Sequence, residues 1–217
     1  MTDVRGGMRP GDERRRRLPS LTGAADRAES ALVAAYLRRS GLSLGAGARF
    51  LGPPLVRMER GSTVTIGHRF VAVSRSSRTA LGVNHRVIIR TLRPGAVILI
   101  GEDVGMSGGT ICAALAVTIG AGCLLGANVT IVDNDFHPVD HLSRRYAPMP
   151  EPRPEDAVVI GRNVFIGTGS IVLRGSTIGD NAVVGAGSVV RGRVEPATVV
   201  LGHPVRPVRS LRTAAGF

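Results

Sequence analysis

VVIGRNVFIGTGSIVLRGSTIGDNAVVGAGSVV, residues 158–190, is the stretch of sequence that decides the fold. An aliphatic residue recurs at every sixth position through this stretch, and glycine directly follows four of these six residues. The six positions are Ile160, Ile166, Val172, Ile178, Val184 and Val190. A repeat with this period indicates a parallel β-helix.

Two earlier blocks carry the same spacing, one at Ile100, Met106 and Cys112 and the other at Ile119, Leu125 and Ile131. Each unit of six residues forms one short strand and one corner, so three units close a triangular coil of eighteen residues. Stacked coils pair as parallel strands roughly 4.8 Å apart. The aliphatic residue points inward, and glycine occupies the tight corner because a Cβ atom would collide there.

Composition agrees with a narrow, uniformly layered core. The chain has 217 residues, of which 43% are hydrophobic but only 3% are aromatic, and it has no Trp. Its 29 glycines are close to twice the average usage. The core must therefore be filled by Val, Ile, Leu and Ala.

The formal net charge of +12 raises the question of a nucleic-acid partner. All 28 basic residues are Arg and none is Lys, which indicates a composition bias rather than a binding patch. The densest run, Arg14 to Arg17, has no interleaved aromatic residues for base stacking. We expect no nucleic-acid partner, although the basic surface could suit a phosphorylated cofactor or an acidic polysaccharide.

Two features bear on the compartment. Cys112 and Cys123 lie among aliphatic residues, which predicts buried, unreactive thiols rather than a disulfide framework. Near the N-terminus no apolar segment resembles a signal peptide, and the run from Ala31 to Leu37 is too short to span a bilayer. We expect a cytoplasmic protein without membrane insertion.

Four regions are expected along the chain. A basic tail over residues 1–22 is predicted to be disordered. A helix region over residues 23–45 follows, with an amphipathic helix from Ala25 to Arg39 that ends at Ser40-Gly41. Residues 46–200 form the β-helix, irregular up to about Arg93, and residues 201–217 form a C-terminal cap or tail. The expected apolar face of the helix consists of Leu32, Val33, Tyr36 and Leu37.

The repeat fails once. The inward position after Ile131 is His137, and the following Pro138 cannot donate to a strand ladder. The period resumes at Ile160, twenty-nine residues after Ile131, which is not a multiple of six. Residues 133–157 are therefore expected to form one extended loop that protrudes from the prism. Loops carried on a rigid scaffold are where functional groups concentrate.

Three stretches carry a resemblance to a known family: VTIVDNDFHPVD, the stretch quoted first above, and VEPATVVLGHPVRPVR. From about Gly101 to Arg209 the chain resembles the hexapeptide-repeat acyltransferases, specifically the galactoside, maltose and polysaccharide O-acetyltransferase group. The resemblance implies an all-β fold, a left-handed parallel β-helix of hexapeptide repeats with a short N-terminal helix. It also implies a homotrimer with active sites between subunits, where acetyl-CoA binds.

In this family the catalytic histidine stands before a proline, and His137 matches it. The resemblance implies that His137 is the general base, taking the proton of an acceptor hydroxyl as its oxygen attacks the acetyl thioester directly. Histidine suits this role because a neutral imidazole is available at cellular pH. We expect the acceptor to be a sugar or a polysaccharide precursor.

The residues beside His137 have two possible roles. Asn134 and Asp135, together with Asp133, could orient the imidazole or hold the hydroxyls of the acceptor, and a backbone carbonyl could orient the ring equally well. Ser107 falls near the place where the galactoside enzymes carry an asparagine that faces the acceptor. Serine is shorter than asparagine and cannot make the same pair of contacts, so the resemblance does not identify the acceptor.

The resemblance also implies a set of cofactor contacts. Phe165 stands where relatives place an aromatic ring beside acetyl-CoA. Thr168 and Ala186, eighteen residues apart, stand where backbone N–H groups meet the thioester and the pantetheine arm. Arg191 and Arg206 are candidates for the nucleotide phosphates, although a solvated surface role is equally compatible.

Three other functions fit the sequence less well. A γ-carbonic-anhydrase-like zinc enzyme could use His137, His141 and His85, but its closer histidine pair is spaced five apart rather than four, and we expect no metal. A non-enzymatic basic scaffold is disfavoured by the intact His137 and the unbroken later repeats. Serine acetyltransferases share the repeat but usually carry a longer helical N-terminal domain.

Overall fold

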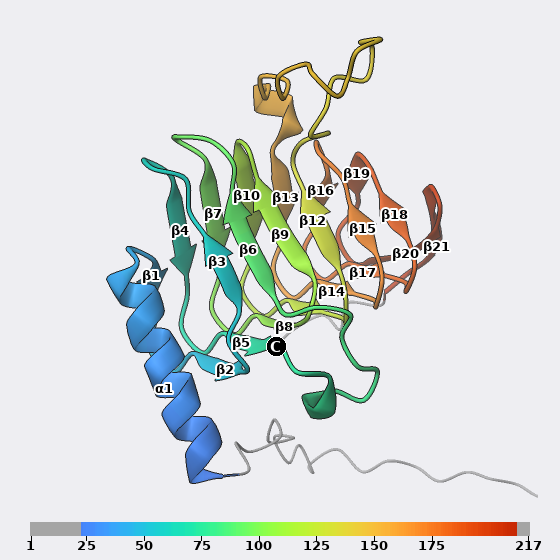
Figure 1. Ribbon diagram of the computed structural model, residues 1–217. Coiled ribbons are helices and arrows are strands. Elements are labelled where there is room, and N and C mark those ends of the chain that lie inside the picture. The colour runs from blue at the N-terminus through green and yellow to red at the C-terminus, as the bar shows by residue number, and fades with distance from the viewer. Residues whose placement is uncertain (1–22, 212–217) are drawn as a thin grey trace, which may run out of the picture.

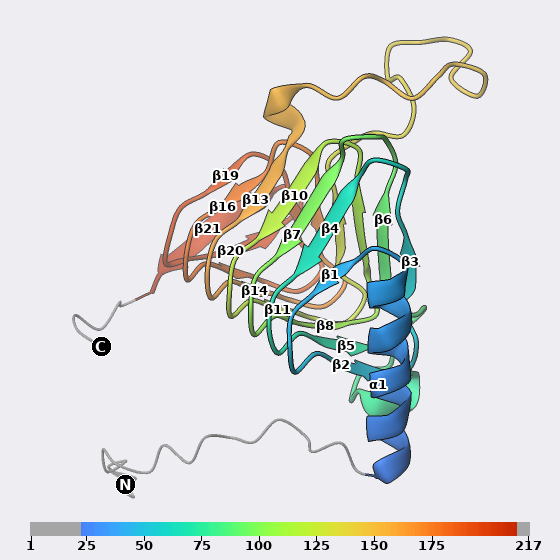
Figure 2. The same cartoon turned by 90° about the vertical axis from the view of Figure 1, so that its left-hand side faces the viewer.

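The computed structural model describes residues 23–211, and the tail predicted over residues 1–22 lies outside this part of the chain, as do residues 212–217. The described chain winds into a triangular prism whose three walls are sheets of short, mainly parallel strands (Figure 1). Figure 2 shows the coils stacked from the N-terminal helix at one end to the last strands at the other. The predicted parallel β-helix is confirmed. Its left-handed winding stays a prediction from the resemblance.

Each coil contributes one strand to each wall. Sheet A consists of β1 (Ser43–Leu44), β4 (Thr63–Ile66), β7 (Val97–Ile100), β10 (Ala116–Ile119), β13 (Val158–Ile160), β16 (Thr177–Ile178) and β19 (Arg193–Val194). Sheet B consists of β2 (Arg49–Leu51), β5 (Val71–Val73), β8 (Gly105–Ser107), β11 (Leu124–Leu125), β14 (Phe165–Ile166), β17 (Val183–Val184), β20 (Thr198–Gly202) and β21 (Val205–Ser210). Sheet C consists of β3 (Leu55–Arg57), β6 (Ile88–Thr91), β9 (Thr110–Ala113), β12 (Thr130–Val132), β15 (Ile171–Val172) and β18 (Val189–Val190).

The core is built from columns of inward aliphatic side chains. In sheet A the column is Leu44, Ile66, Ile100, Ile119, Ile160, Ile178 and Val194. In sheet C it is Val56, Ile89, Ile111, Ile131, Val172 and Val190. Nearly all of these side chains are buried. Because each column repeats the same chemistry in every coil, stability is approximately additive along the stack.

Glycine marks the edge between sheets A and B, which we call the A–B edge. The corner glycines there are Gly45, Gly67, Gly101, Gly120, Gly161 and Gly179. Each donates its backbone N–H to the carbonyl of the inward residue one coil further on, as Gly120 does to Ile160 at 2.8 Å. A Cβ atom on Gly120 would lie 2.5 Å from the carbonyl carbon of Gly161. The corner therefore excludes any side chain.

The first two coils are more regular than the sequence suggested. Strands β1 to β6 occupy the same three sheets as the later strands, and β1 begins at Ser43, inside the region expected to belong to the helix. The six-residue period is hidden because residues 74–87, which include the short helix η1 (Ser76–Arg78), leave the prism between β5 and β6. This excursion separates Ala72 from Ile89, the next inward residue.

The inward position predicted at Cys112 is wrong by one residue. Ile111 pairs with Ile131 and Ile89 in the inward column of sheet C, only five residues after Met106. The corner is shortened at Gly108 and Gly109, which both have positive φ angles, of 57° and 79°. Two consecutive left-handed residues turn the chain more tightly than an ordinary corner.

Helix α1 (Ala24–Arg39) has nearly the predicted bounds, and the predicted apolar face is right for Leu37, which is buried, and for Val33, which packs against the core, but wrong for Leu32 and Tyr36. Leu32 and Tyr36 are 72% and 69% exposed. The buried side chains are Asp26, Ser30, Ala34 and Leu37. The helix packs on the first coil, where the Ser30 hydroxyl accepts the backbone N–H of Phe50 at 3.0 Å. The face of α1 that packs on the first coil thus combines small and polar side chains with Leu37.

The two ends of the prism are closed differently. Helix α1 lies along the first coil (Figure 2), and no helix in residues 23–211 has the length and apolarity needed to cross a membrane. At the other end, β21 turns back and pairs with β20 in the antiparallel sense, so the last strand of sheet B is covered.

The corner glycines generate a stability prediction. We expect Gly120→Ala to lower the free energy of unfolding by about 1–3 kcal/mol, because its Cβ would overlap the backbone of the next coil. Gly105→Ala is the matched control, since a Cβ at Gly105 would meet only a Leu124 methyl at 3.6 Å. Urea denaturation at equal protein concentration measures both, and equal losses would contradict this account of the corner.

Candidate functional site

The predicted loop leaves the prism between β12 and β13, at the edge between sheets C and A, which we call the C–A edge. Residues 133–157 carry no strand and end in the short helix η2 (Pro154–Asp156). Figures 1 and 2 both show this loop projecting from one edge of the prism, while the η1 excursion projects from the other end of the sheet C strands. The loop is therefore set apart from every regular corner.

Asp133 fastens the start of the loop to the scaffold. Its side chain is fully buried, and its carboxylate accepts the backbone N–H groups of Ala114, Leu115 and Ala116, each at 2.7 Å. These three amides form the corner between β9 and β10, one coil earlier. The Asn134 side chain adds a fourth hydrogen bond to the same carboxylate, at 3.1 Å. Asp133 therefore anchors the loop, and neither of its carboxylate oxygens is left free to bind the acetyl-acceptor substrate.

Asn134 shapes the next turn. Its side chain is buried, and its carbonyl oxygen accepts the backbone N–H of Phe136 at 3.1 Å. Phe136 has a φ of 59°, in the left-handed region that non-glycine residues rarely adopt. The amide of Asn134 is therefore engaged at both ends and forms no contact with the His137 imidazole.

Arg174, in the corner between β15 and β16, joins the two ends of the loop. Its guanidinium donates to the Asp135 carboxylate at 2.6 Å and to the Asp156 carboxylate at 2.5 Å. Burial acts to raise the pKa of Asp156, but hydrogen bonds from the Arg153 backbone and from Arg174 outweigh it and lower the pKa. The Asp135 carboxylate thus pairs with Arg174 rather than with His137.

A second arginine holds the returning arm of the loop. Arg93 donates to the carbonyl oxygens of Met149 at 2.8 Å and Pro150 at 3.1 Å, and it pairs with Glu151 at 2.5 Å. Arg93 belongs to the corner between β6 and β7, two coils before the loop. Together with the Arg174 clamp, this contact attaches both arms of a proline-rich segment to the rigid prism.

His137 lies at the base of the outgoing arm and its side chain is exposed. Its backbone N–H donates to the Asp135 carbonyl at 2.6 Å, which fixes the course of the chain through a tight turn. The imidazole forms no hydrogen bond with any residue of the range 23–211. The His137 imidazole, which the sequence predicts to be the general base, is thus exposed to solvent on a well-anchored turn. Neither Asn134 nor Asp135 orients its ring.

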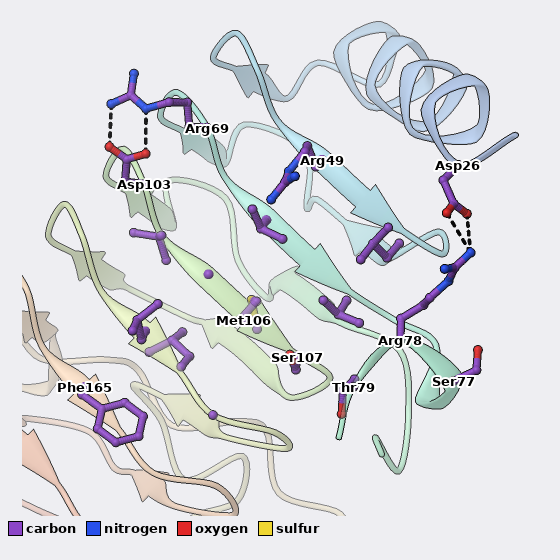
Figure 3. Close-up of a pocket in the computed structure, with 18 residues that line it drawn as sticks. Asp26, Arg49, Arg69, Ser77, Arg78, Thr79, Asp103, Met106, Ser107 and Phe165 are labelled. Atoms are coloured by element: carbon purple, nitrogen blue, oxygen red, sulfur yellow. Dashed lines mark hydrogen bonds and ion pairs between the residues drawn. The ribbon is translucent and has the colours of Figure 1, made fainter. Parts of the chain in front are cut away.

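A groove of about 630 Å³ lies on the outer face of sheet B (Figure 3). Ser107 and Phe165 both line it, so the structure brings together one residue predicted for the acceptor and one predicted for the cofactor. Aliphatic side chains from β2, β5 and β11 form its floor. The Phe165 ring is 46% exposed, which leaves a face open for stacking.

Thr168 and Ala186 lie on the edge between sheets B and C, which we call the B–C edge, in the corners after β14 and β17. They are one coil apart, and a Cβ on Gly167 would lie 2.4 Å from the Ala186 nitrogen. The Thr168 hydroxyl donates to the Ala127 carbonyl at 2.7 Å. Within residues 23–211 neither backbone N–H of this pair has an acceptor, so both donors remain available along the edge.

The two predicted phosphate ligands are far apart in the fold. Arg191 follows β18 at the C–A edge, whereas Arg206 lies in β21 on sheet B, and both are exposed. Among the residues that the structure describes, the Arg206 guanidinium donates only to the Val205 carbonyl, at 3.3 Å. One chain therefore does not bring these two guanidinium groups to a common phosphate site.

The predicted site residues fall into two groups at opposite ends of the sheet C strands. His137 and Arg191 lie at the C–A edge, and Ser107, Thr168 and Ala186 lie at the B–C edge. Figure 1 shows this separation, with the loop at one end of these strands and β8 at the other. A single chain thus does not bring the His137 imidazole together with Ser107, Thr168 and Ala186.

The histidines of the zinc alternative are also separated within one chain. His85 belongs to the η1 excursion, while His137 and His141 belong to the loop, and the His141 Nδ1 accepts the Ser143 backbone N–H at 3.0 Å. Across the described part of the chain, no three His, Cys, Asp or Glu side chains lie close enough to hold a metal ion.

Both thiols are buried, as the sequence indicated. Burial, with a further contribution from Asp133, raises the pKa of Cys112 to about 11. Burial also raises the pKa of Cys123, whose Sγ donates to the Gly161 carbonyl at 3.1 Å. Protonated thiols of this kind are poor nucleophiles.

Comparison with known families identifies the repeat. Residues 157–192 match the family described as bacterial transferase hexapeptide (six repeats), and residues 116–132 match the hexapeptide repeat of succinyl-transferase. The galactoside O-acetyltransferase of Escherichia coli K12 is 39% identical over 102 residues, which are 47% of this chain and 48% of that protein. A putative lipopolysaccharide biosynthesis O-acetyltransferase of the same organism is 38% identical over 98 residues, 43% of this chain and 50% of its own.

The chain thus spans about half the length of the curated relatives it matches. Two solved structures share the fold. A hexapeptide-repeat acetyltransferase from Vibrio cholerae, complexed with acetyl coenzyme A, superposes with a TM-score of 0.51 at 24% identity, covering 89% of this chain and 82% of that chain. A mutant N-acyltransferase from Bacillus cereus, complexed with a dTDP-amino sugar and coenzyme A, superposes with a TM-score of 0.57 at 14% identity, covering 83% and 90%.

The Asp133 anchor generates the second prediction. We expect Asp133→Ala to lower the free energy of unfolding by about 3 kcal/mol, because three backbone amides, one buried and two partly buried, lose their hydrogen-bond acceptor. Asp140→Ala, which removes an exposed carboxylate of the same loop, should change it by less than about 0.5 kcal/mol. Equal unfolding midpoints in urea for the two variants would show that Asp133 is not an anchor.

The Arg174 clamp generates a pH prediction. The folded-state pKa of Asp156 is lowered, so its contribution is fully present above the ordinary value of about 4 and is lost as the pH falls through the lowered pKa. Hydrogen-exchange protection of loop amides should therefore survive mild acid and disappear in stronger acid. Asp156→Asn should show weak protection at every pH, and a variant that retains the acid transition would exclude Asp156 as its origin.

Proposed function

Because this chain is a hexapeptide-repeat protein related to galactoside O-acetyltransferases, we propose that it transfers an acetyl group from acetyl-CoA to a hydroxyl of a sugar or polysaccharide precursor. The observation that carries the proposal is the exposed His137 imidazole on an anchored turn, at the start of the loop that interrupts the repeat between β12 and β13. The matched segments belong to relatives named as O-acetyltransferases, which supports the same chemistry here.

His137 is the proposed general base. Its neutral imidazole takes the proton of the acceptor hydroxyl while the hydroxyl oxygen attacks the thioester carbonyl carbon. The C–S bond then breaks, and the imidazolium returns the proton to the departing sulfur, so that ester and thiol are formed and the histidine is restored. Such assistance typically accelerates a reaction by about 10² to 10⁴. No covalent bond to the protein is needed.

The B–C edge is the proposed place for acetyl-CoA. The unpaired amides of Thr168 and Ala186 are suited to carbonyl groups on an extended arm, because they repeat at the spacing of one coil. A donor of this kind near the thioester oxygen would stabilise the developing oxyanion. Phe165 offers a ring face beside them, and Arg191 and Arg206 are proposed contacts for the nucleotide phosphates, each from its own edge.

A homotrimer with the site between copies reconciles these assignments. His137 lies at the C–A edge, whereas Thr168 and Ala186, the proposed contacts of the thioester and the pantetheine arm, lie at the B–C edge, so the base of one copy must face the B–C edge of another. Ser107, in the groove of that second copy, is the proposed acceptor contact. Asn134 and Asp135 contribute by holding the His137 turn in place.

Thiol release from acetyl-CoA across a panel of simple glycosides, oligosaccharides and nucleotide sugars tests the proposal. We expect His137→Ala to lower kcat on the best acceptor by about 10² to 10⁴. His141→Ala, in the same loop, should retain activity within about threefold because His141 only accepts a backbone N–H. Full activity of His137→Ala would exclude His137 as the base, and a monomer in analytical ultracentrifugation would exclude the shared site.

A further inference from the structure

Two ion-paired arginines flank the groove on sheet B (Figure 3). Near helix α1, Arg78 donates to both oxygens of the buried Asp26 carboxylate at 2.7 Å. On the other side, Arg69 donates to Asp103 at 2.6 and 2.5 Å and to Glu102 at 2.9 Å. The hydrogen bond from Arg69 lowers the pKa of Asp103, which therefore stays ionised. These pairs set the two polar sides of the groove.

Between them the floor is apolar. Leu51, Val71, Val73, Leu124 and Phe165 present their side chains outward from sheet B into the groove. A surface of this kind suits the C–H face of a sugar ring, which packs on aliphatic and aromatic side chains while its hydroxyls reach the polar sides. Ser107 supplies a hydroxyl at the end of the groove nearest the B–C edge.

Arg49 differs from the other two arginines of the groove. It projects from β2 between the two ion pairs (Figure 3) and its side chain is only partly exposed. Within residues 23–211 its guanidinium has neither a carboxylate partner nor a hydrogen-bond acceptor. Arg69 and Arg78 are each neutralised by bonded carboxylates, so Arg49 brings a positive charge that no residue in the described part of the chain pairs with.

We propose that Arg49 selects an acceptor that carries a carboxylate or phosphate group, held in this groove beside Ser107. The inference rests on the proposed acetyl transfer and names its substrate class: an acidic sugar or a sugar phosphate. A guanidinium binds both anions through paired N–H donors, and it does so more strongly where neighbouring apolar surface excludes water. The flanking ion pairs hold Arg69 and Arg78 away from the ligand and leave this role to Arg49.

Acceptor preference tests the proposal. Methyl β-D-glucuronide, glucose 1-phosphate and methyl β-D-glucoside share one ring but differ in the anionic group, and kcat/KM for thiol release is measured with each. We expect at least one anionic acceptor to exceed the neutral glucoside by about tenfold or more. The anionic acceptor with the higher kcat/KM shows whether the groove prefers a carboxylate or a phosphate. Equal values for all three would overturn the proposal.

Substitutions at Arg49 test whether this residue is the source of the preference for anionic acceptors. Arg49→Gln should lower the ratio of anionic to neutral kcat/KM by about tenfold or more, and Arg49→Lys should restore part of it because the charge returns without the paired donors. Arg57→Gln, which removes an exposed arginine of β3 outside the groove, should leave the ratio unchanged. A ratio that is unaffected by Arg49→Gln would refute the assignment, as would an equal fall in Arg57→Gln.

A binding measurement separates this inference from the proposed reaction. Calorimetric titration of the full chain with methyl β-D-glucuronide and glucose 1-phosphate, without acetyl-CoA, should detect binding that Arg49→Gln weakens by about tenfold or more. Arg49-dependent binding without acetyl transfer would support the groove and exclude the reaction. Acetyl transfer without anion preference would support the reaction and exclude the role of Arg49.

Discussion

The close approach of successive coils is the constraint on which the rest of the structure depends. At the A–B edge each corner glycine donates its N–H to the next coil at 2.8 or 2.9 Å, a distance that leaves no room for a side chain. The same approach aligns the inward aliphatic residues into continuous columns. Because the corners are uniform, the three edges of the prism are straight. The position of a residue in the sequence therefore nearly determines the sheet and the coil in which it lies.

This regularity explains how much of the fold could be predicted. From Ile119 to Val190 the six-residue period holds, apart from the one loop, and it identifies the inward residues without error. Prediction from the period fails where the local structure departs from the regular repeat. Gly108 and Gly109 shorten one corner, the η1 excursion hides the second coil, and helix α1 meets a sheet end that takes Ser30 rather than the more hydrophobic Leu32.

The candidate site was predictable to a different degree. The break before Pro138 located His137 and the loop because a lost period is a local signal. The contacts that hold the loop carry no such signal. Arg174 reaches Asp135 across 39 positions, and Asp133 caps amides of the previous coil, so both contacts exist only once the coils are stacked. Arg49 was missed for the same reason, since its neighbours in the groove come from other coils.

The reversal at β21 has a consequence for the size of the molecule. The remaining strands of sheet B pair in the parallel sense, and the repeat itself contains no feature that ends the stack. By folding back on β20, the chain occupies the last growing edge of that wall with its own backbone. Sheet B therefore ends in an antiparallel strand of the same chain, and Pro207 with the exposed Arg206 and Arg209 of β21 disfavours pairing of that edge with another protein.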